Sequence, residues 1–154
     1  MGLGQKILRD AEITQYDKFH AGKLGQELKH RVQVVKGIWD FADQGGAVGT
    51  GDLKDDDGNV IKLPAGVIIR QVYTREVTNV TTSAAGTLAF DSEASGDLLT
   101  DTAAATFSGI QAGEPVGTAA TMVRLTAERT LGYEIKTGAL TAGKVEVFVE
   151  LVNL

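Results

Sequence analysis

A strict period of two in residues 144–152 constrains the fold of this chain more than any other feature. In KVEVFVELV, Val145, Val147, Val149 and Leu151 alternate with Glu146, Phe148 and Glu150. Successive side chains of a β-strand point to opposite faces of a sheet, so one side of this segment belongs in a core. The other side carries acids around one aromatic ring. Phe148 is therefore either a surface aromatic or a plug in a subunit contact, and we favour the contact.

The rest of the chain predicts more short strands of this kind. Segments 32–42, 67–77, 86–92, 121–126 and 130–137 are rich in apolar or β-branched residues, and glycine-containing turns separate them. An aromatic content of 6% and 19 glycines suit short strands and tight turns better than long helices. Helical segments do not alternate with the strands. We therefore expect an all-β protein, an antiparallel β-sandwich of jelly-roll type.

Within segment 32–42, the core candidates are Val34, Ile38 or Trp39, and Phe41. Gly37 interrupts the alternation and predicts a β-bulge. Trp39 is a large apolar side chain, and we expect it to anchor the core rather than to serve as a ligand platform.

Four further segments carry specific predictions. Segment 67–77 is apolar on both alternations, which predicts a central strand between two layers. Segment 43–53 reads as a glycine-rich loop, and 54–66 as a hairpin that turns at Asp57-Gly58. In 95–107, Ser95 predicts the N-cap of one helical turn, with loop beyond it.

Charge divides the chain unevenly. Residues 1–36 hold seven Lys/Arg and four acids, which leaves eight basic and sixteen acidic residues in 37–154. A mildly basic start on an acidic body predicts contact with an acidic surface, or alternatively a solvated mixed-charge segment. The excess is too small to indicate nucleic acid binding.

Residues 1–31 differ from the rest and are expected to form an arm on a body of residues 32–154. Apolar residues fall at helical spacing there, but Gly22 and Gly25 interrupt any long helix. We expect a partly irregular or short-helical arm, ordered mainly by a partner. Its apolar anchors are Tyr16, Phe19, Leu24 and Leu28. The alternative, that they pack on the chain's own body, stays open.

Familiar catalytic and cofactor patterns do not emerge. The chain has no cysteine and two histidines, His20 and His30, both in the arm, so neither a nucleophilic triad nor a zinc site is expected. GGAVGTG lacks the Lys-Ser/Thr that completes a phosphate-binding loop. We therefore expect no enzyme activity, catalytic residue, cofactor or metal.

One metal alternative remains around Asp52–Asp57. An EF-hand is excluded because Leu53 and Pro64 occupy the positions where carboxylates are needed. A looser calcium site using Asp52, Asp55 and Asp56 stays open. The sequence shows neither an apolar run of membrane-spanning length nor a signal-like segment, which predicts a soluble protein made in the cytoplasm.

Five motifs in order resemble a family of small tailed-bacteriophage virion proteins, the capsid decoration (cement) and head-surface structural proteins. They are D-F-x-x-x-G-G-x-x-G-x-x-x-L within 38–53, LPAG within 62–70 and DLL within 95–107. P-V-G-T-A-A-x-x-x-x-L-T-A-x-R and A-L-T-A-G-K follow within 114–152. The match runs from Ile38 to the C-terminal end and leaves out the arm.

The resemblance implies a β-sandwich that forms a homotrimer on the outer capsid surface of the virion, made in the host cytoplasm. It would clamp adjacent subunits of the major capsid protein and contact neither nucleic acid nor membrane. The alternative is the base of a head fibre or a tail-associated structural or adhesin protein. A carbohydrate-binding or hydrolytic sandwich is a third hypothesis, which would need clustered exposed aromatics or paired carboxylates in a cleft.

Overall fold

The computed structural model describes residues 32–113 and 123–153. The expected arm 1–31 lies outside this part, so the boundary between arm and body stays a prediction. Residues 114–122, which contain the first part of the motif P-V-G-T-A-A-x-x-x-x-L-T-A-x-R, also lie outside it.

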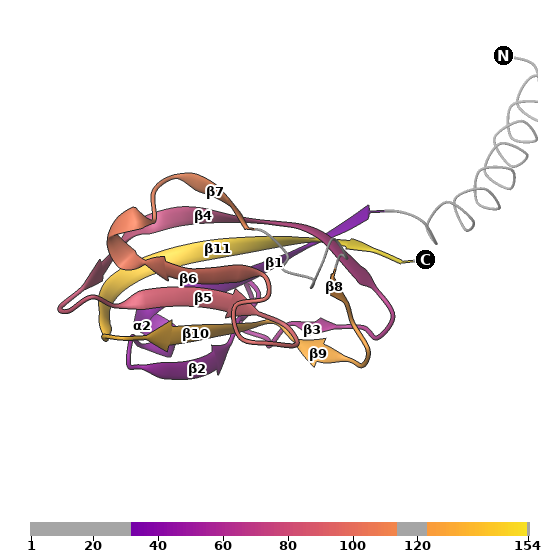
Figure 1. Cartoon of the computed structure of the whole chain (residues 1–154), viewed down its shortest axis with the longest axis horizontal. Helices are drawn as coiled ribbons and strands as arrows, with labels where there is room; N and C mark the ends of the chain where they lie inside the picture. The colour runs from indigo at the N-terminus through magenta and orange to yellow at the C-terminus, as the bar shows by residue number, and fades with distance from the viewer. Residues whose placement is uncertain (1–31, 114–122, 154) are drawn as a thin grey trace, which may run out of the picture.

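Two sheets make up the body, and their strands run along its long axis (Figure 1). Sheet A contains β1 (Val32–Asp40), β11 (Leu140–Val152), β4 (Ile68–Thr82) and β7 (Ile110–Gly113) in that order, with β8 (Val123–Arg124) also paired to β4. Sheet B contains β2 (Gly49–Asp52), β10 (Gly132–Lys136), β5 (Thr87–Asp91) and β6 (Leu99–Ala103). The short strands β3 (Lys62–Leu63) and β9 (Arg129–Thr130) form a separate pair, and the helical turns are α2 (Phe41–Gln44) and η2 (Ala104–Thr106).

The strand order confirms the predicted jelly roll. The first strand pairs with the last, β1 with β11, and β2 pairs with β10 in the other sheet. β4 then lies beside β11, and β5 beside β10. All these pairings are antiparallel, and the chain passes between the two sheets in the manner of a double Greek key.

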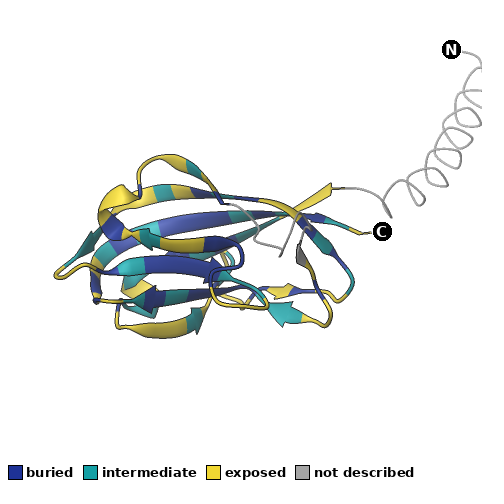
Figure 2. Cartoon of the chain, viewed as in Figure 1, coloured by how far each residue is buried: buried dark blue, intermediate teal, exposed yellow. Residues whose placement is uncertain are grey.

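The core lies between the sheets, and the closing strand contributes to it as predicted. Val145, Val147 and Val149 are fully buried, and Leu151 is 3% exposed. Trp39 is also fully buried, as predicted, with its ring edge-on to Tyr133 at a centroid distance of 6.5 Å. Figure 2 shows this burial concentrated along the middle of β11, β5 and β10.

Two of the predictions for β1 are wrong. Val34 is 53% exposed, because the buried positions of β1 are those of Gly37 and Trp39. The register between β1 and β11 is continuous, so Gly37 does not mark a bulge. A side chain at Gly37 would place its Cβ 2.9 Å from Leu131 Cδ2 and 3.0 Å from Leu53 Cδ1. The glycine is there because two core leucines pack against the backbone.

β4 does contain a bulge, and this corrects the prediction of a strand buried on both faces. Two consecutive residues of β11 pair with Ile69 and Gln71, so Arg70 is an extra residue in β4. The inward alternation therefore changes from Ile69 to Val72. Before the bulge the odd-numbered residue Ile69 faces the core, and after it the even-numbered residues Val72 and Thr74 do. Both alternations are therefore apolar in the sequence, although the outer face of β4 is partly exposed.

The glycine-rich segment 43–53 is not all loop, because Gly49–Asp52 forms the edge strand β2. A Cβ at Gly51 would lie 2.5 Å from the hydroxyl oxygen of Tyr133. Because Gly51 has no side chain, this ring packs directly against the backbone of β2, an arrangement that composition alone does not indicate. The turn predicted at Asp57-Gly58 is confirmed, with Gly58 at φ 84°.

The helical turn predicted after Ser95 is also wrong. Leu99–Ala103 forms β6, and the residues before it form a loop that Asp97 closes. The Asp97 carboxylate accepts hydrogen bonds from the backbone amides of Ser92, Glu93 and Ala94 at 2.8, 3.0 and 3.2 Å. The Asp97 carboxylate thus holds the preceding loop in place, and it does not cap a helix.

Candidate interface

The outer face of sheet A carries an aromatic pair. Phe148 of β11 stacks on Tyr73 of β4, with ring centroids 5.2 Å apart and an interplanar angle of 14°. The two residues are direct partners in the register of the sheet. On the other side of Phe148 lies Lys36 of β1. The pair thus occupies the middle of the sheet rather than its margin.

A row of charges next to this pair is internally compensated. Arg75 donates to Glu146 through Nε at 2.8 Å and approaches it through Nη2 at 2.6 Å. Lys36 lies 3.9 Å from the same carboxylate and 2.6 Å from Asp56. The Glu146 side chain is only 10% exposed, so these cations offset the desolvation of a carboxylate on this face.

Apolar side chains without cover surround these groups. Four of the large hydrophobic residues that are exposed lie on the strands of sheet A: Val32 (40%), Val34 (53%), Val77 (48%) and Ile110 (74%). In Figure 2 the start of β1 and the segment leading into β7 are marked as exposed. Val32 and Val34 lie on β1 and Ile110 lies on β7, so both margins of the sheet offer apolar side chains for contact.

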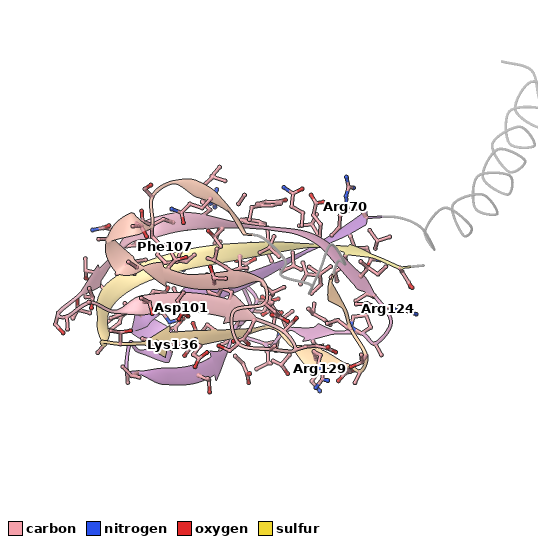
Figure 3. The ribbon with its side chains drawn as sticks, in the orientation of Figure 1. Arg70, Asp101, Phe107, Arg124, Arg129 and Lys136 are labelled. Atoms are coloured by element: carbon pink, nitrogen blue, oxygen red, sulfur yellow. The ribbon has the colours of Figure 1, made fainter. Side chains whose placement is uncertain are left out.

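Two arginines at one end of sheet A add positive charge. Arg124 pairs through its backbone with Ile68 at the start of β4, and Arg70 is the extra residue of the bulge. Figure 3 shows both side chains directed away from the body. Among the described residues, no acidic group lies within salt-bridge distance of either guanidinium. Arginine next to apolar and aromatic side chains is typical of protein interfaces.

The outer face of sheet B is different in character. Asp52, Gly132 and Asp91 form one row across β2, β10 and β5. Burial, followed by the nearby charges of Asp97 and Glu134, raises the pKa of Asp91 to about 6. Sheet B therefore presents an acidic face, and within the described part of the chain Asp91 has no ion-pair partner.

The charges further along β10 are better compensated. Lys136 lies 3.0 Å from Asp101 and 3.2 Å from Glu134 (Figure 3). The hydrogen bond with Asp101, then that with Glu134, raises the pKa of Lys136. A hydrogen bond from Ser95 and one from Lys136 lower the pKa of Glu134. These exposed pairs contribute little stability.

Of the predicted contact residues, Phe148 lies on the outer face of sheet A. Tyr16, Phe19, Leu24 and Leu28 lie outside the described residues. Sequence reasoning missed Tyr73, the stacking partner of Phe148, and Ile110. Tyr73 was missed because the pairing of β4 with β11 is not visible in the sequence. Ile110 stands in a short strand without a periodic pattern.

The calcium alternative gains no support from the described residues. The Asp55 carboxylate accepts from the backbone amides of Asp57 and Asn59, at 2.9 and 2.8 Å, and so closes its own turn. Asp56 pairs with Lys36. No group of three or more His, Cys, Asp or Glu side chains in the described part is arranged to hold a metal ion. His20 and His30 lie outside this part.

The helices of the described residues include none with the length and hydropathy of a membrane-spanning segment.

No family model matches the sequence, and no curated protein is similar to it. Solved structures, however, superpose on this chain. A chain of the Cyanophage Pam1 capsid asymmetric unit superposes with a TM-score of 0.60 and 17% identity, over 81% of this chain and 86% of the other. The fold is shared with phage capsid structures.

Two further similarities agree with this. A chain in the capsid of Ralstonia phage GP4 gives a TM-score of 0.58 at 13% identity, covering 80% of this chain and 85% of its own. A chain in the acidic stable capsid structure of Helicobacter pylori bacteriophage KHP30 gives 0.56 at 14%, covering 80% and 89%. Identities this low establish the fold and leave the function to be argued from the surface.

Proposed function

We propose that this chain is a non-enzymatic structural protein of a tailed-bacteriophage head. In this role it decorates the outer surface of the capsid, binds across the seams between major capsid protein subunits and stabilises the DNA-filled shell. The observation that carries the proposal is a jelly roll of the kind found in phage capsid structures, with an outer sheet face built for contact.

The chemistry of that face supports binding to protein. The stacked pair Tyr73–Phe148 and the exposed Ile110 supply apolar area. Arg70 and Arg124 supply positive charge at its edge. Aromatic and arginine side chains dominate binding energy in protein interfaces, and an acidic shell surface would attract the arginines electrostatically.

The arm is proposed to extend this contact. Tyr16, Phe19, Leu24 and Leu28 would act as apolar anchors, and the basic excess of the first 36 residues would favour an acidic capsid surface. Binding that occurs only to the assembled shell stabilises the assembled state by mass action. A protein of this kind adds strength at the seams without any chemical step.

Imaging tests the proposal. Purified protein is mixed with expanded, undecorated capsids of the phage that encodes it, and the particles are examined by cryo-electron microscopy. We expect density repeated over the whole outer surface at the positions where capsid subunits meet. Density confined to one vertex or to the tail would instead support the head-fibre or tail-associated alternative. Assembly of the protein into shells by itself would make it a major capsid protein.

A matched variant connects the surface to binding. Arg70→Glu with Arg124→Glu reverses the two uncompensated charges on sheet A, and Lys62→Glu with Arg129→Glu makes the same change in net charge on the separate β3–β9 pair. We expect the first variant to lose at least tenfold in affinity for capsids and the second to bind like the parent. Equal binding by both would remove sheet A from the contact.

A further inference from the structure

We infer that copies of this chain join edge to edge, with the open edge of β1 in one copy pairing with the open edge of β7 in the next. The inference concerns the contact between copies in the absence of any capsid, and so goes beyond the proposed function. It rests on backbone directions at the two margins of sheet A and on the side chains there.

The first half of β1 is an unpaired edge. Ile38 donates to the Lys54 carbonyl at 2.8 Å and accepts from the Lys54 amide at 3.3 Å, so its backbone groups point away from β11. Backbone groups alternate in direction along a strand, so those of Val34 and Lys36 point toward the same margin. Within the described residues, no strand pairs with them.

The opposite margin of the sheet has the same property. The Glu76 amide donates to the Gly109 carbonyl at 2.9 Å, so the backbone groups of Gly109 face β4. By the same alternation, those of Ile110 and Ala112 face away from β4. In the described part of the chain, β7 is paired with β4 alone.

The side chains at the two margins fit one another. Val34 and Ile110 lie on the outer face of the sheet, since they pair across it with Glu150 and Arg75. They are 53% and 74% exposed. Unpaired edges that carry exposed apolar side chains are ready to pair with another strand.

A register follows from these directions. Residues opposite each other in an antiparallel pair have their open backbone groups and their side chains on matching sides, so Val34 can face Ile110 of the next copy. Val32 then faces Ala112 and Lys36 faces Ser108, with no like charges opposed. β1 and β7 run in opposite directions within the sheet, so the pairing is antiparallel when copies share one orientation along the strands.

Because the two edges differ, the contact is head-to-tail, and such contacts close into rings when the rotation between copies permits. A second copy of this chain is the partner that fits, because its open β7 edge matches the open β1 edge of the first copy. A two-fold pairing of β1 with β1 would leave the more exposed Ile110 uncovered.

Cysteine cross-linking tests the inference cleanly, because the chain has no native cysteine. Opposed residues in a sheet lie within the Cα separation that a disulfide spans. On oxidation, Val34→Cys/Ile110→Cys is expected to give covalent oligomers larger than a dimer. A mixture of the two single variants is expected to give dimers only, and each single variant alone is expected to stay uncross-linked. Val34→Cys/Thr50→Cys, with its second cysteine on sheet B, is the control.

Three results would overturn the inference. Dimers of Val34→Cys alone would show two-fold pairing of β1, and sedimentation of the native chain as a monomer would show that copies do not associate. If the native chain forms oligomers but Val34→Cys/Ile110→Cys does not cross-link, the copies make contact through another surface. A folding check by circular dichroism accompanies each variant, and Val34→Lys, folded but at least tenfold weaker in self-association, provides a second readout. These measurements use no capsids, so a failure of shell binding leaves them unaffected.

Discussion

Phe148 and Tyr73 lie face to face on the outer side of sheet A, 5.2 Å apart, directly above a core that neither ring enters. Val147 and Val149, the chain neighbours of Phe148, are fully buried on the opposite side. The Phe148 side chain therefore contributes only modestly to the free energy of unfolding, and its ring is available for contact with a partner.

Phe148→Ala is expected to lower the free energy of unfolding by about 1 kcal/mol, the scale of a stacked aromatic pair beyond its area. Val149→Ala, one residue further and inside the core, is expected to lower it by about 2 kcal/mol because it leaves a cavity. Urea unfolding measures both. For capsid binding the order reverses: Phe148→Ala loses affinity and Val149→Ala, once folded, does not. Phe148→Tyr keeps the stack and serves as the control.

Arg75→Met removes the main cation next to Glu146, a carboxylate whose side chain is only 10% exposed. The remaining cation, Lys36, is 3.9 Å away. We expect a loss of about 1–2 kcal/mol in the free energy of unfolding, because a nearly buried charge is left poorly compensated. In a double-mutant cycle with Glu146→Gln, the coupling energy should be about 1 kcal/mol. A coupling of zero would mean that the pair makes no net contribution to stability.

The sequence was sufficient to predict the architecture because alternation in the closing strand and in 130–137 is uninterrupted. Leu131, Tyr133 and Ile135 all face the core, as their spacing indicates. The pairing order of the strands depends on contacts between distant segments. The jelly-roll type was therefore predicted from the number of short strands and from the turn content, not from any one segment.

Where prediction failed, the cause was an interaction between distant segments. The bulge at Arg70 shifts the buried alternation of β4, and only the register against β11 reveals it. Gly37 and Gly51 looked like local breaks but are sites where Leu131 and Tyr133 approach the backbone. The partnership of Phe148 with Tyr73 is hidden for the same reason.

Alanine substitutions at Gly37 and Gly46 compare a close contact with flexible side chains and a close contact with backbone. A Cβ at Gly37 would meet the flexible ends of Leu131 and Leu53, at 2.9 and 3.0 Å, whereas one at Gly46 would lie 2.1 Å from the carbonyl oxygen of Leu140. That oxygen belongs to a backbone fixed by the bond from the Leu140 amide to the Gly46 carbonyl, 2.8 Å long. We expect Gly37→Ala to cost about 1–2 kcal/mol of unfolding free energy and Gly46→Ala about 3 kcal/mol or more. Thermal unfolding ranks them, and the opposite order would contradict the close backbone approach at Gly46.

The acidic face of sheet B predicts an unusual dependence on pH. The pKa of Asp91 is raised from 3.8 to about 6, chiefly by burial and then by Asp97 and Glu134. Between these two values the folded chain holds a proton that the unfolded chain has released. The contribution of Asp91 to stability is therefore full below pH 3.8 and is lost as pH rises toward 6. This direction is opposite to that of a carboxylate held by a cation.

Asp91→Asn, which removes this charge, is expected to raise the free energy of unfolding by about 1 kcal/mol at pH 8, a value discounted for the partial exposure of the group. At pH 4 the variant and the parent should be nearly equal, because Asp91 is largely protonated in the folded parent there. Chemical unfolding at both pH values measures the difference, with Asp57→Asn at the exposed tip of its turn as the control. A variant that is less stable than the parent at pH 8 would mean that the ionised Asp91 has a compensating partner.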